Sequence, residues 1–250
     1  MIPRIIHYCW FGGKELPELA QKCIATWKDK CSDYQIMRWD EATFDINSVP
    51  YVKEAYENKK FAFVTDYVRL WAIYNYGGVY MDTDVEVCKS IDVFLDEYAF
   101  SGFESYTDIP TGIMAGEKNL QIYKELLDYY TDRHFVKENG ELDLTTNVTI
   151  FTEIFEKKGL TRDNTKQTID GYTFYPKGYF CPNDKDRLHR KEQIYTIHHF
   201  AGSWLPEEEI RRRNSLSYKL KWKTVSAIRN VLIAILGEKN FDKLRGRNKS

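Results

Sequence analysis

The segment that ends in Asp84 constrains the fold of this chain more than any other part of the sequence. Apolar side chains recur at helical spacing from Phe61 to Tyr76, and Gly77-Gly78 supplies a stop to that helix. Val79 to Met81 then has the apolar character of a short buried strand, and Asp82 and Asp84 follow at its carboxyl end. This order predicts an α/β unit that presents two acidic side chains at a strand end.

Strand and helix patterns alternate along most of the remaining sequence. The expected strands cover residues 3–11, 34–39, 85–88, 98–103, 111–115, 173–175 and 195–200. The expected helices cover residues 16–30, 120–130 and 146–158. The alternation predicts an α/β fold with helices on both faces of a sheet, in which ligands bind beyond the carboxyl ends of the strands.

The composition changes at Arg211. Residues 211–250 contain 12 Lys and Arg but two acidic residues, whereas the whole chain has a net charge of −1. The apolar residues of this tail recur at helical spacing, and they are Tyr218, Trp222, Val225, Ile228, Leu232 and Ile235. A chain of 250 residues is long enough for one main domain. We therefore expect a domain over residues 1–210 and a basic amphipathic helical tail over residues 211–250.

Two roles are open for the tail. Residues 215–236 are suited to lie on an anionic membrane surface, because they combine an apolar stripe with basic side chains. The alternative is an ordinary surface helix that packs on the domain or on a partner protein. The acidic balance of residues 1–210 argues against nucleic acid as a partner.

The cysteines and the N-terminal residues favour a cytoplasmic protein. The five cysteines are odd in number and form no CxxC pair, which argues against both a zinc site and a secreted disulfide framework. Met1 to Arg4 has no character of a secretory leader, and no stretch reaches the roughly 20 apolar residues that span a bilayer. Through its tail, the protein has the option of a peripheral position on the inner face of the membrane.

Two aspartates one residue apart at a strand end are able to reach one hard divalent cation and, through it, an anionic diphosphate. The spacing alone is a weak signal, because Asp184 and Asp186 repeat it in a charged segment. The apolar helix and strand that precede Asp82 and Asp84 distinguish the first copy. A turn or capping role is the alternative for this pair.

Further candidates for binding lie before the acidic pair. Asp66 and Arg69 are three residues apart on the expected helix. They are suited to hold sugar hydroxyl groups, or they form an ion pair within the helix. Trp10 ends the first expected strand, where it either stacks on a nucleobase or joins the core.

More candidates follow near the end of the expected domain. His198 and His199 are neighbours on a strand and therefore point to opposite faces, so that at most one enters a site as a metal ligand. The Ser203 hydroxyl and the Trp204 indole N–H come next, and both are suitable hydrogen-bond donors for a phosphate.

Four segments in this order resemble glycosyltransferase family 32. They are Ile2 to Gly12, Phe61 to Arg69, Gly77 to Asp84 and Ile197 to Trp204, which together span residues 2–204. That family contains sugar transferases with a DxD motif, among them bacterial capsule enzymes and initiating mannosyltransferases of fungi. The resemblance implies a GT-A fold, which is a single nucleotide-binding domain with a mixed central sheet, and transfer with retention of anomeric configuration.

The resemblance also implies a metal site. Asp84 matches the direct metal ligand, and Asp82 matches the carboxylate shared between the donor and the metal shell. His198 matches the histidine five residues before Ser-Trp, whereas the HFxG pattern of a related family would select His199 as its substitute. The implied cofactor is Mn²⁺ or Mg²⁺, and a nitrogen ligand favours Mn²⁺.

The remaining implied roles concern the donor and the reaction. The donor-binding set is Trp10, Phe11, Asp66, Arg69, Asp82, Thr83, Ser203 and Trp204. The catalytic set is Asp82, Asp84, Asp66, Arg69 and Asn147. Relatives often carry Thr-Gly-Pro where this chain has Thr146-Asn147-Val148, and Asn147 still offers an amide to the sugar at that position.

The expected function is transfer of a hexose from a nucleotide sugar, with UDP favoured over GDP, to a glycan or lipid-linked oligosaccharide. The expected setting is the synthesis of a bacterial capsule or surface polysaccharide. Two alternatives are a toxin-like glycosyltransferase that modifies proteins and a non-catalytic module that binds nucleotides or glycans.

Overall fold

The computed structural model of the protein describes residues 1–105, 108–109, 112–182, 191–202, 208, 211–212, 215–237 and 240–241. Its helices are α1 (Glu18–Lys30), α2 (Pro50–Glu57), α3 (Phe61–Tyr76), α4 (Gln121–Asp128), α5 (Asn147–Lys157) and α8 (Leu216–Leu236), with short 3-10 helices η1 (Asp92–Phe94) and η2 (Lys191–Gln193). Its strands are β1 (Ile5–Cys9), β2 (Gln35–Trp39), β3 (Gly78–Met81), β4 (Val85–Val87), β5 (Ala99–Gly102), β6 (Ile113–Gly116), β7 (Gln167–Ile169), β8 (Tyr172–Tyr175) and β9 (Thr196–His198).

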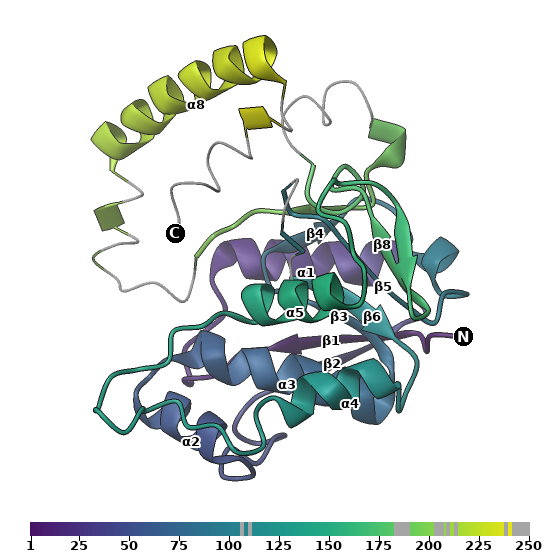
Figure 1. Cartoon of the computed structure of the whole chain (residues 1–250), viewed down its shortest axis with the longest axis vertical. Helices are drawn as coiled ribbons and strands as arrows, with labels where there is room; N and C mark the ends of the chain where they lie inside the picture. Colours follow the sequence, from purple (N-terminus) through teal and green to yellow (C-terminus); the bar gives the residue numbers. More distant parts are fainter. Residues whose placement is uncertain are drawn as a thin grey trace.

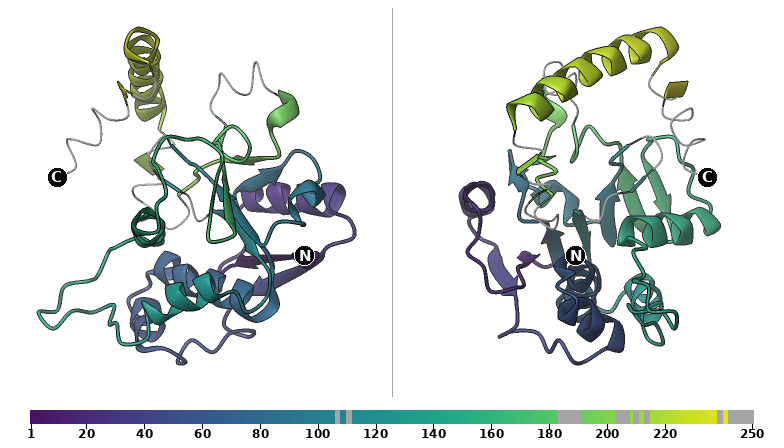
Figure 2. Two further views of the ribbon diagram at one scale, coloured as in Figure 1. Left: turned by 45° about the vertical axis from the view of Figure 1, so that its right-hand side comes forward. Right: turned by 90° about the vertical axis from the view of Figure 1, so that its left-hand side faces the viewer.

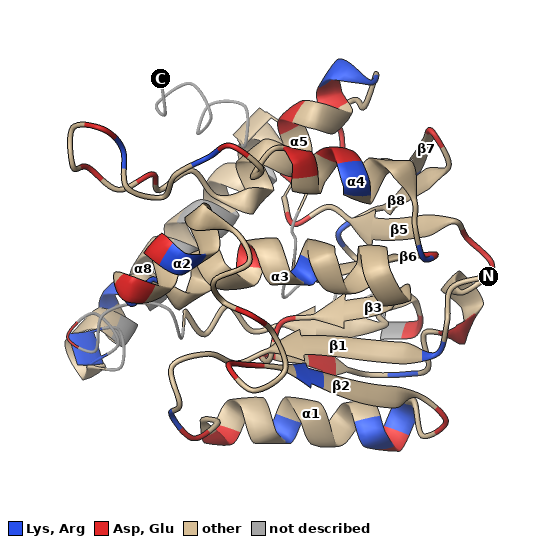
Figure 3. Ribbon diagram, turned by 90° about the horizontal axis from the view of Figure 1, so that it is seen from below, with Lys and Arg blue, Asp and Glu red and all other residues tan. Residues whose placement is uncertain are grey.

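The larger of two sheets contains seven strands in the order β2-β1-β3-β6-β5-β8-β7 (Figure 3). β1 runs parallel to β2 and β3, and β5 runs parallel to β8. The pairs β3–β6, β5–β6 and β7–β8 are antiparallel. Helices α3, α4 and α5 contribute side chains to the core on one face of this sheet, and α1 contributes to the core on the other face. The mixed sheet flanked by helices confirms the expected α/β architecture.

Neighbouring residues of the central strands pack into different cores. Tyr80 and Met114 belong to the core that α3 covers. Val79 and Met81 belong to the core on the opposite face, which includes Trp27 of α1. The central strands are therefore buried on both faces, which leaves the ends of these strands as the place for a ligand.

Helix α3 has the bounds predicted from the sequence and ends at Gly77. Gly77 and Gly78 have φ angles of 68° and 108°, in the left-handed region that favours glycine. A Cβ on Gly78 would lie 2.7 Å from the Ile5 carbonyl oxygen, so glycine also permits the close passage of β1. His7 Nε2 donates to the Gly77 carbonyl oxygen over 2.7 Å. The turn thus leads α3 directly into β3, which ends just before Asp82.

Strands β4 and β9 form the second sheet, in antiparallel register with Val85 opposite His198. Side chains of α1 occupy the other edge of β4. The Trp27 indole N–H donates to the Val85 carbonyl oxygen over 2.7 Å, and the Val87 N–H donates to Thr26 Oγ1 over 2.9 Å. Hydrogen bonds on both edges therefore position β4 between α1 and β9.

Helix α8 confirms the prediction of a helix in the tail. The Ser215 hydroxyl accepts a hydrogen bond from the Tyr218 N–H at its start. Its exposed apolar side chains are Leu216, Leu220, Trp222, Val225, Ile228, Val231, Leu232, Ile235 and Leu236. Figures 1 and 2 show that α8 lies apart from the seven-stranded sheet. Among the helices that the structure describes, none is both long and apolar enough to cross a membrane.

Candidate active site

The acidic pair after β3 meets the end of β9. Val85 is paired with His198, and the imidazole of His198 lies beside Asp84, the residue that precedes β4. His198 Nε2 is 3.2 Å from Asp84 Oδ1 and 3.9 Å from Asp82 Oδ2. One ligand atom from each of Asp82, Asp84 and His198 lies within 4.8 Å of the other two. The register of a small sheet thus joins three potential ligands from distant parts of the chain.

The segment after β9 wraps around Asp84. The His199 N–H donates to the Asp84 carbonyl oxygen over 3.0 Å, and the Ala201 N–H donates to Asp84 Oδ2 over 2.7 Å. Burial alone would raise the pKa of Asp84, but His198 and the Ala201 N–H lower it below its ordinary value. Asp84 is therefore an ionised carboxylate at neutral pH.

The imidazole of His198 is held in an acidic setting. Burial acts to lower the pKa of His198, but the Asp84 carboxylate, the Cys181 thiol and the Asp82 carboxylate raise it well above its ordinary value. The imidazole therefore carries a proton that Asp84 and Asp82 attract. A metal cation attracted by the same two carboxylates would replace that proton on the imidazole nitrogen.

Arg69 is buried between two carboxylates. One guanidinium nitrogen, Nη2, is 3.3 Å from Asp66 Oδ1 and 3.4 Å from Asp82 Oδ1. The guanidinium also lies 4.6 Å from the centre of the Tyr80 ring, and the Tyr80 hydroxyl donates to Asp82 Oδ1 over 2.7 Å. Asp66 and Arg69 do form the ion pair within the helix, and the same arginine extends that pair to Asp82.

Asn147 lies at the start of α5 and joins this cluster from a different element. Its backbone N–H donates to Asp66 Oδ2 over 3.2 Å, and its Nδ2 donates to the Asp66 carbonyl oxygen over 3.1 Å. Asn147 Oδ1 is buried and has no hydrogen-bond partner among the residues that the structure describes. Burial, opposed by Arg69 and the Asn147 N–H, raises the pKa of Asp66 to about 6.

The side chains of three other expected residues, His199, Trp10 and Phe11, have other partners. His199 Nε2 lies 2.9 Å from Glu86 Oε2, and His199 therefore pairs with a residue other than Asp82 or Asp84. Trp10 is half-buried, and its indole N–H donates to the Lys14 carbonyl oxygen over 2.6 Å. The side chain of Phe11 is buried in the core on the α3 face. Trp10 is thus partly accessible, whereas Phe11 is buried.

Other expected residues lie beside the acidic pair or outside the described part of the chain. Thr83 is a buried residue between Asp82 and Asp84. Ser203 and Trp204 fall outside the described residues, as do Asp184 and Asp186.

Three residues at the site were not predicted from the sequence. Tyr80 is hydrogen bonded to Asp82, and alternation along β3 was the signal that would have placed it on the α3 face. Gly112 accepts a hydrogen bond from the Asp82 N–H over 2.8 Å. The Phe200 ring stacks on His198 with 4.1 Å between ring centroids. The roles of Gly112 and Phe200 arise from tertiary packing alone.

The arrangement is chemically suited to a divalent cation. Two carboxylates supply hard oxygen ligands, and one imidazole supplies a nitrogen ligand. The neighbouring cluster of Asp66, Arg69 and Asn147 supplies a buried ion pair and an amide oxygen without a partner among the described residues, which is suited to accept from a hydroxyl group.

Part of the chain matches a known family. Residues 17–101 match the family described as the glycosyltransferase sugar-binding region containing a DXD motif. The matched residues include Asp66, Arg69, Asp82 and Asp84, whereas His198 lies beyond them.

Two curated relatives and one solved structure are similar to this chain. Inositol phosphoceramide mannosyltransferase 3 of Schizosaccharomyces pombe is 30% identical over 146 residues, which are 54% of this chain and 40% of the yeast protein. The uncharacterized glycosyltransferase L373 of Acanthamoeba polyphaga mimivirus is 25% identical over 222 residues, which are 82% of this chain and 85% of the viral protein. A glycosyltransferase involved in glycosylation of the major capsid of PBCV-1 has a TM-score of 0.48 at 15% identity, over 83% of this chain and 97% of that chain. This chain thus spans less than half the length of the yeast relative.

Proposed function

Since this chain is a DxD-containing glycosyltransferase of the family 32 type, we propose that it transfers a hexose from a nucleotide sugar to a glycan or lipid-linked oligosaccharide, with retention of configuration. A UDP-sugar is the proposed donor ahead of a GDP-sugar, and bacterial capsule or surface polysaccharide synthesis is the proposed setting. The observation that carries this proposal is the meeting of Asp82, Asp84 and His198 beside the buried pair of Asp66 and Arg69.

Asp84, His198 and Asp82 would hold the cation of this reaction. Their ligand atoms lie within 4.8 Å of one another, which suits one divalent ion, and the imidazole nitrogen favours Mn²⁺ over Mg²⁺. When bound, the ion supplies positive charge that neutralises the departing nucleoside diphosphate. Asp84 is held by the Ala201 N–H, so this carboxylate is oriented before any ligand arrives.

The donor sugar would lie against Asp66, Arg69 and Asn147. Arg69 keeps Asp82 in place through their ion pair. Asn147 Oδ1 is a buried acceptor that lacks a partner among the described residues, so a sugar hydroxyl would satisfy it. We assign the nucleobase to the accessible part of the Trp10 ring.

The proposed route to retention is attack by the acceptor hydroxyl on the face that the leaving diphosphate occupies. Arg69 engages Asp66 and Asp82, and His198 engages Asp84. These carboxylates are therefore bound as structural and metal-binding groups, which makes them poor covalent nucleophiles. A phosphate oxygen of the donor would then take the proton of the acceptor hydroxyl.

The test is donor hydrolysis with a panel of UDP- and GDP-sugars in the presence of Mn²⁺. We expect slow release of free sugar from one preferred donor, and a loss of at least about 100-fold in Asp84→Asn. The exposed Asp132→Asn is a matched control in which turnover stays normal. Normal turnover in Asp84→Asn would refute the assignment of Asp84. Tight donor binding without sugar release by the unaltered chain would favour a non-catalytic binding module.

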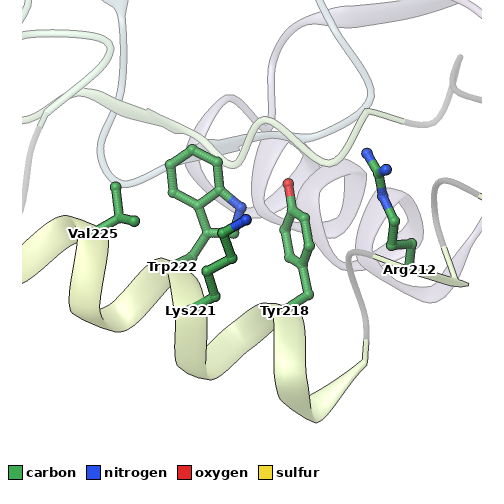
Figure 4. A pocket seen from close by; sticks show the side chains of 5 residues that line it. All are labelled: Arg212, Tyr218, Lys221, Trp222 and Val225. Carbon is green, nitrogen blue, oxygen red and sulfur yellow. The ribbon is translucent and has the colours of Figure 1, made fainter.

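The tail is proposed to bring the enzyme to a membrane that holds its acceptor. Figure 4 shows Tyr218, Trp222 and Val225 on one side of α8 together with Lys221, and these residues and Arg212 line a hollow of about 440 Å³. Residues 211–237 contain no acidic residue, and this fits a surface of anionic lipid. On this basis we propose a cytoplasmic protein that binds the inner face of the membrane, with residues 1–210 as the catalytic domain.

Sedimentation with vesicles tests the role of the tail. We expect the full chain to sediment with phosphatidylglycerol-containing vesicles and less with pure phosphatidylcholine vesicles. A chain without residues 215–250 should stay in solution with both. Equal binding by the two chains would refute the membrane role and favour packing on a protein partner.

A further inference from the structure

The second ring nitrogen of His198 has no strong hydrogen-bond partner among the described residues. A metal-binding histidine normally donates its other ring N–H to a carboxylate, a carbonyl or water, and this bond fixes the ring orientation. In this chain Nδ1 of His198 is buried and has no hydrogen-bond partner among the described residues. The one partner found for the ring besides the carboxylates, in the described part of the chain, is the Cys181 thiol, and a thiol forms only a weak hydrogen bond. This weak bond leaves packing as a further means of orienting the ring.

Gly112 packs against the Nδ1 edge of this ring. A Cβ added to Gly112 would lie 2.7 Å from His198 Cε1, 2.9 Å from His198 Nδ1 and 3.1 Å from Asp82 Oδ2. The φ angle of Gly112 is outside the left-handed region, so its backbone would also suit alanine. Among the described residues, the close approach of two proposed metal ligands thus favours glycine at this position.

Phe200 packs on the face of the same ring. The two rings are stacked, with 4.1 Å between centroids and 29° between planes. Phe200 has a φ angle of 51°, which is unfavourable for a bulky side chain, and 49% of its surface is exposed. The hydrogen bonds from the His199 and Ala201 N–H groups to Asp84 hold the backbone on both sides of it. Asp84, another of the proposed metal ligands, thus holds the strained and exposed Phe200 over the imidazole of His198.

We propose that Gly112 and Phe200 are positioning residues that orient His198 for metal binding by packing, in addition to the weak contact with the Cys181 thiol. Gly112 sets how closely the ring approaches Asp82, and Phe200 limits its rotation toward solvent. The inference rests on the metal site in the proposed function. It adds that the affinity of this site for a cation depends on two residues that offer no ligand atom.

The test is the Mn²⁺ dissociation constant of the full chain, measured from the EPR signal of free Mn²⁺. We expect Gly112→Ala to raise the Kd by about 10- to 100-fold, which is the usual effect of disturbing the groups behind a ligand. Phe200→Leu keeps an apolar side chain but removes the stacking, and we expect about a threefold to tenfold rise. Phe200→Tyr keeps the ring and should restore a Kd within about twofold of the unaltered chain.

Gly116→Ala is the matched control for Gly112→Ala. It lies in β6 with a φ angle that also suits alanine, and its added Cβ would meet Tyr123 Cε2 at 2.5 Å, away from the three ligands. We expect a lower urea midpoint in EDTA but an unchanged Mn²⁺ Kd. The visible spectrum of bound Co²⁺ gives a second readout, which should change in Gly112→Ala and not in Gly116→Ala.

The outcomes separate the two claims. If the unaltered chain binds Mn²⁺ no better than Asp84→Asn, the metal site of the proposed function is wrong. If the unaltered chain binds Mn²⁺ and both Gly112→Ala and Phe200→Leu bind it equally well, positioning by packing is refuted. A Gly116→Ala chain that loses as much affinity as Gly112→Ala would also refute it, because general destabilisation would explain the loss. If Gly112→Ala does not fold, the comparison of Phe200→Leu with Phe200→Tyr decides.

Discussion

Replacing Arg69 with methionine should destabilise the domain by leaving Asp66 with a buried charge and no cation. The arginine side chain is 7% exposed, whereas the side chains of Asp66 and Asp82 are 12% and 27% exposed. Removing one partner of a buried ion pair costs about 3 to 5 kcal/mol. Asp82 retains some contact with water, and methionine preserves part of the packing against Tyr80. We therefore expect a loss near the lower limit, about 3 kcal/mol.

The pH dependence of this loss follows from the pKa of Asp66. Burial raises the pKa of Asp66 to about 6 in the folded chain, above its ordinary value of 3.8. The folded chain therefore holds the Asp66 proton more tightly than the unfolded chain does. Protonation of Asp66 stabilises the fold at low pH, and this stabilisation is lost as the pH rises through about 6. Without Arg69 the pKa of Asp66 would rise further, so Arg69→Met should cost more at pH 8 than at pH 5.

Urea unfolding in EDTA measures this effect without a contribution from metal. With a slope of about 3 kcal/mol per M for a domain of this size, Arg69→Met should lower the midpoint by about 1 M at pH 8. Adding Asp66→Asn removes the unpaired charge and should recover more than half of that loss. A midpoint within about 0.3 M of the unaltered chain, or no recovery in the double variant, would refute this account of the cluster.

Two further predictions concern groups outside the ligand set. Trp27→Phe removes the indole N–H that donates to the Val85 carbonyl oxygen, so we expect a loss of about 1 to 3 kcal/mol in urea unfolding and a weaker Mn²⁺ Kd as β4 shifts. An unchanged Kd would mean that α1 does not position β4. Burial would raise the pKa of Glu54, but the Val136 N–H and His134 lower this pKa overall. The Glu54 carboxylate therefore stabilises the fold at neutral pH, and this effect is lost as the pH falls through the pKa of Glu54 in the folded chain. Glu54→Gln should therefore cost about 1 kcal/mol at pH 7 and less at pH 3.5, and an equal cost at both values would contradict this reasoning.

Local patterns predicted much of the central fold. The bounds of α3 followed from its apolar spacing and from Gly77-Gly78, because these glycines take φ angles that other residues avoid. Helix α2 was not predicted, although Pro50 at its first turn was a usable signal. Strand β7 has only three residues and a partly exposed pattern, so the sequence offered little periodicity to detect.

The candidate site was predictable only as a set of separate parts. Strand alternation indicated that at most one of His198 and His199 enters the site. The contact of the His198 imidazole with Asp84 depends on the pairing of β4 with β9, which no local pattern encodes. The contacts of Gly112 with His198 likewise depend on tertiary packing, because its φ angle does not itself require glycine.

The contact between Asp84 and the segment after β9 has a consequence for folding of the chain during its synthesis. Asp84 and Ala201 are 117 positions apart, so a cation held by Asp84 and His198 would act as a reversible cross-link across nearly half of the sequence. During synthesis the two aspartates would emerge from the ribosome long before the histidine, and the nascent chain would lack its nitrogen ligand until the sheet strands had been made. The cation site would thus be complete only after β9 had paired with β4, and a chain that has not folded would not be active.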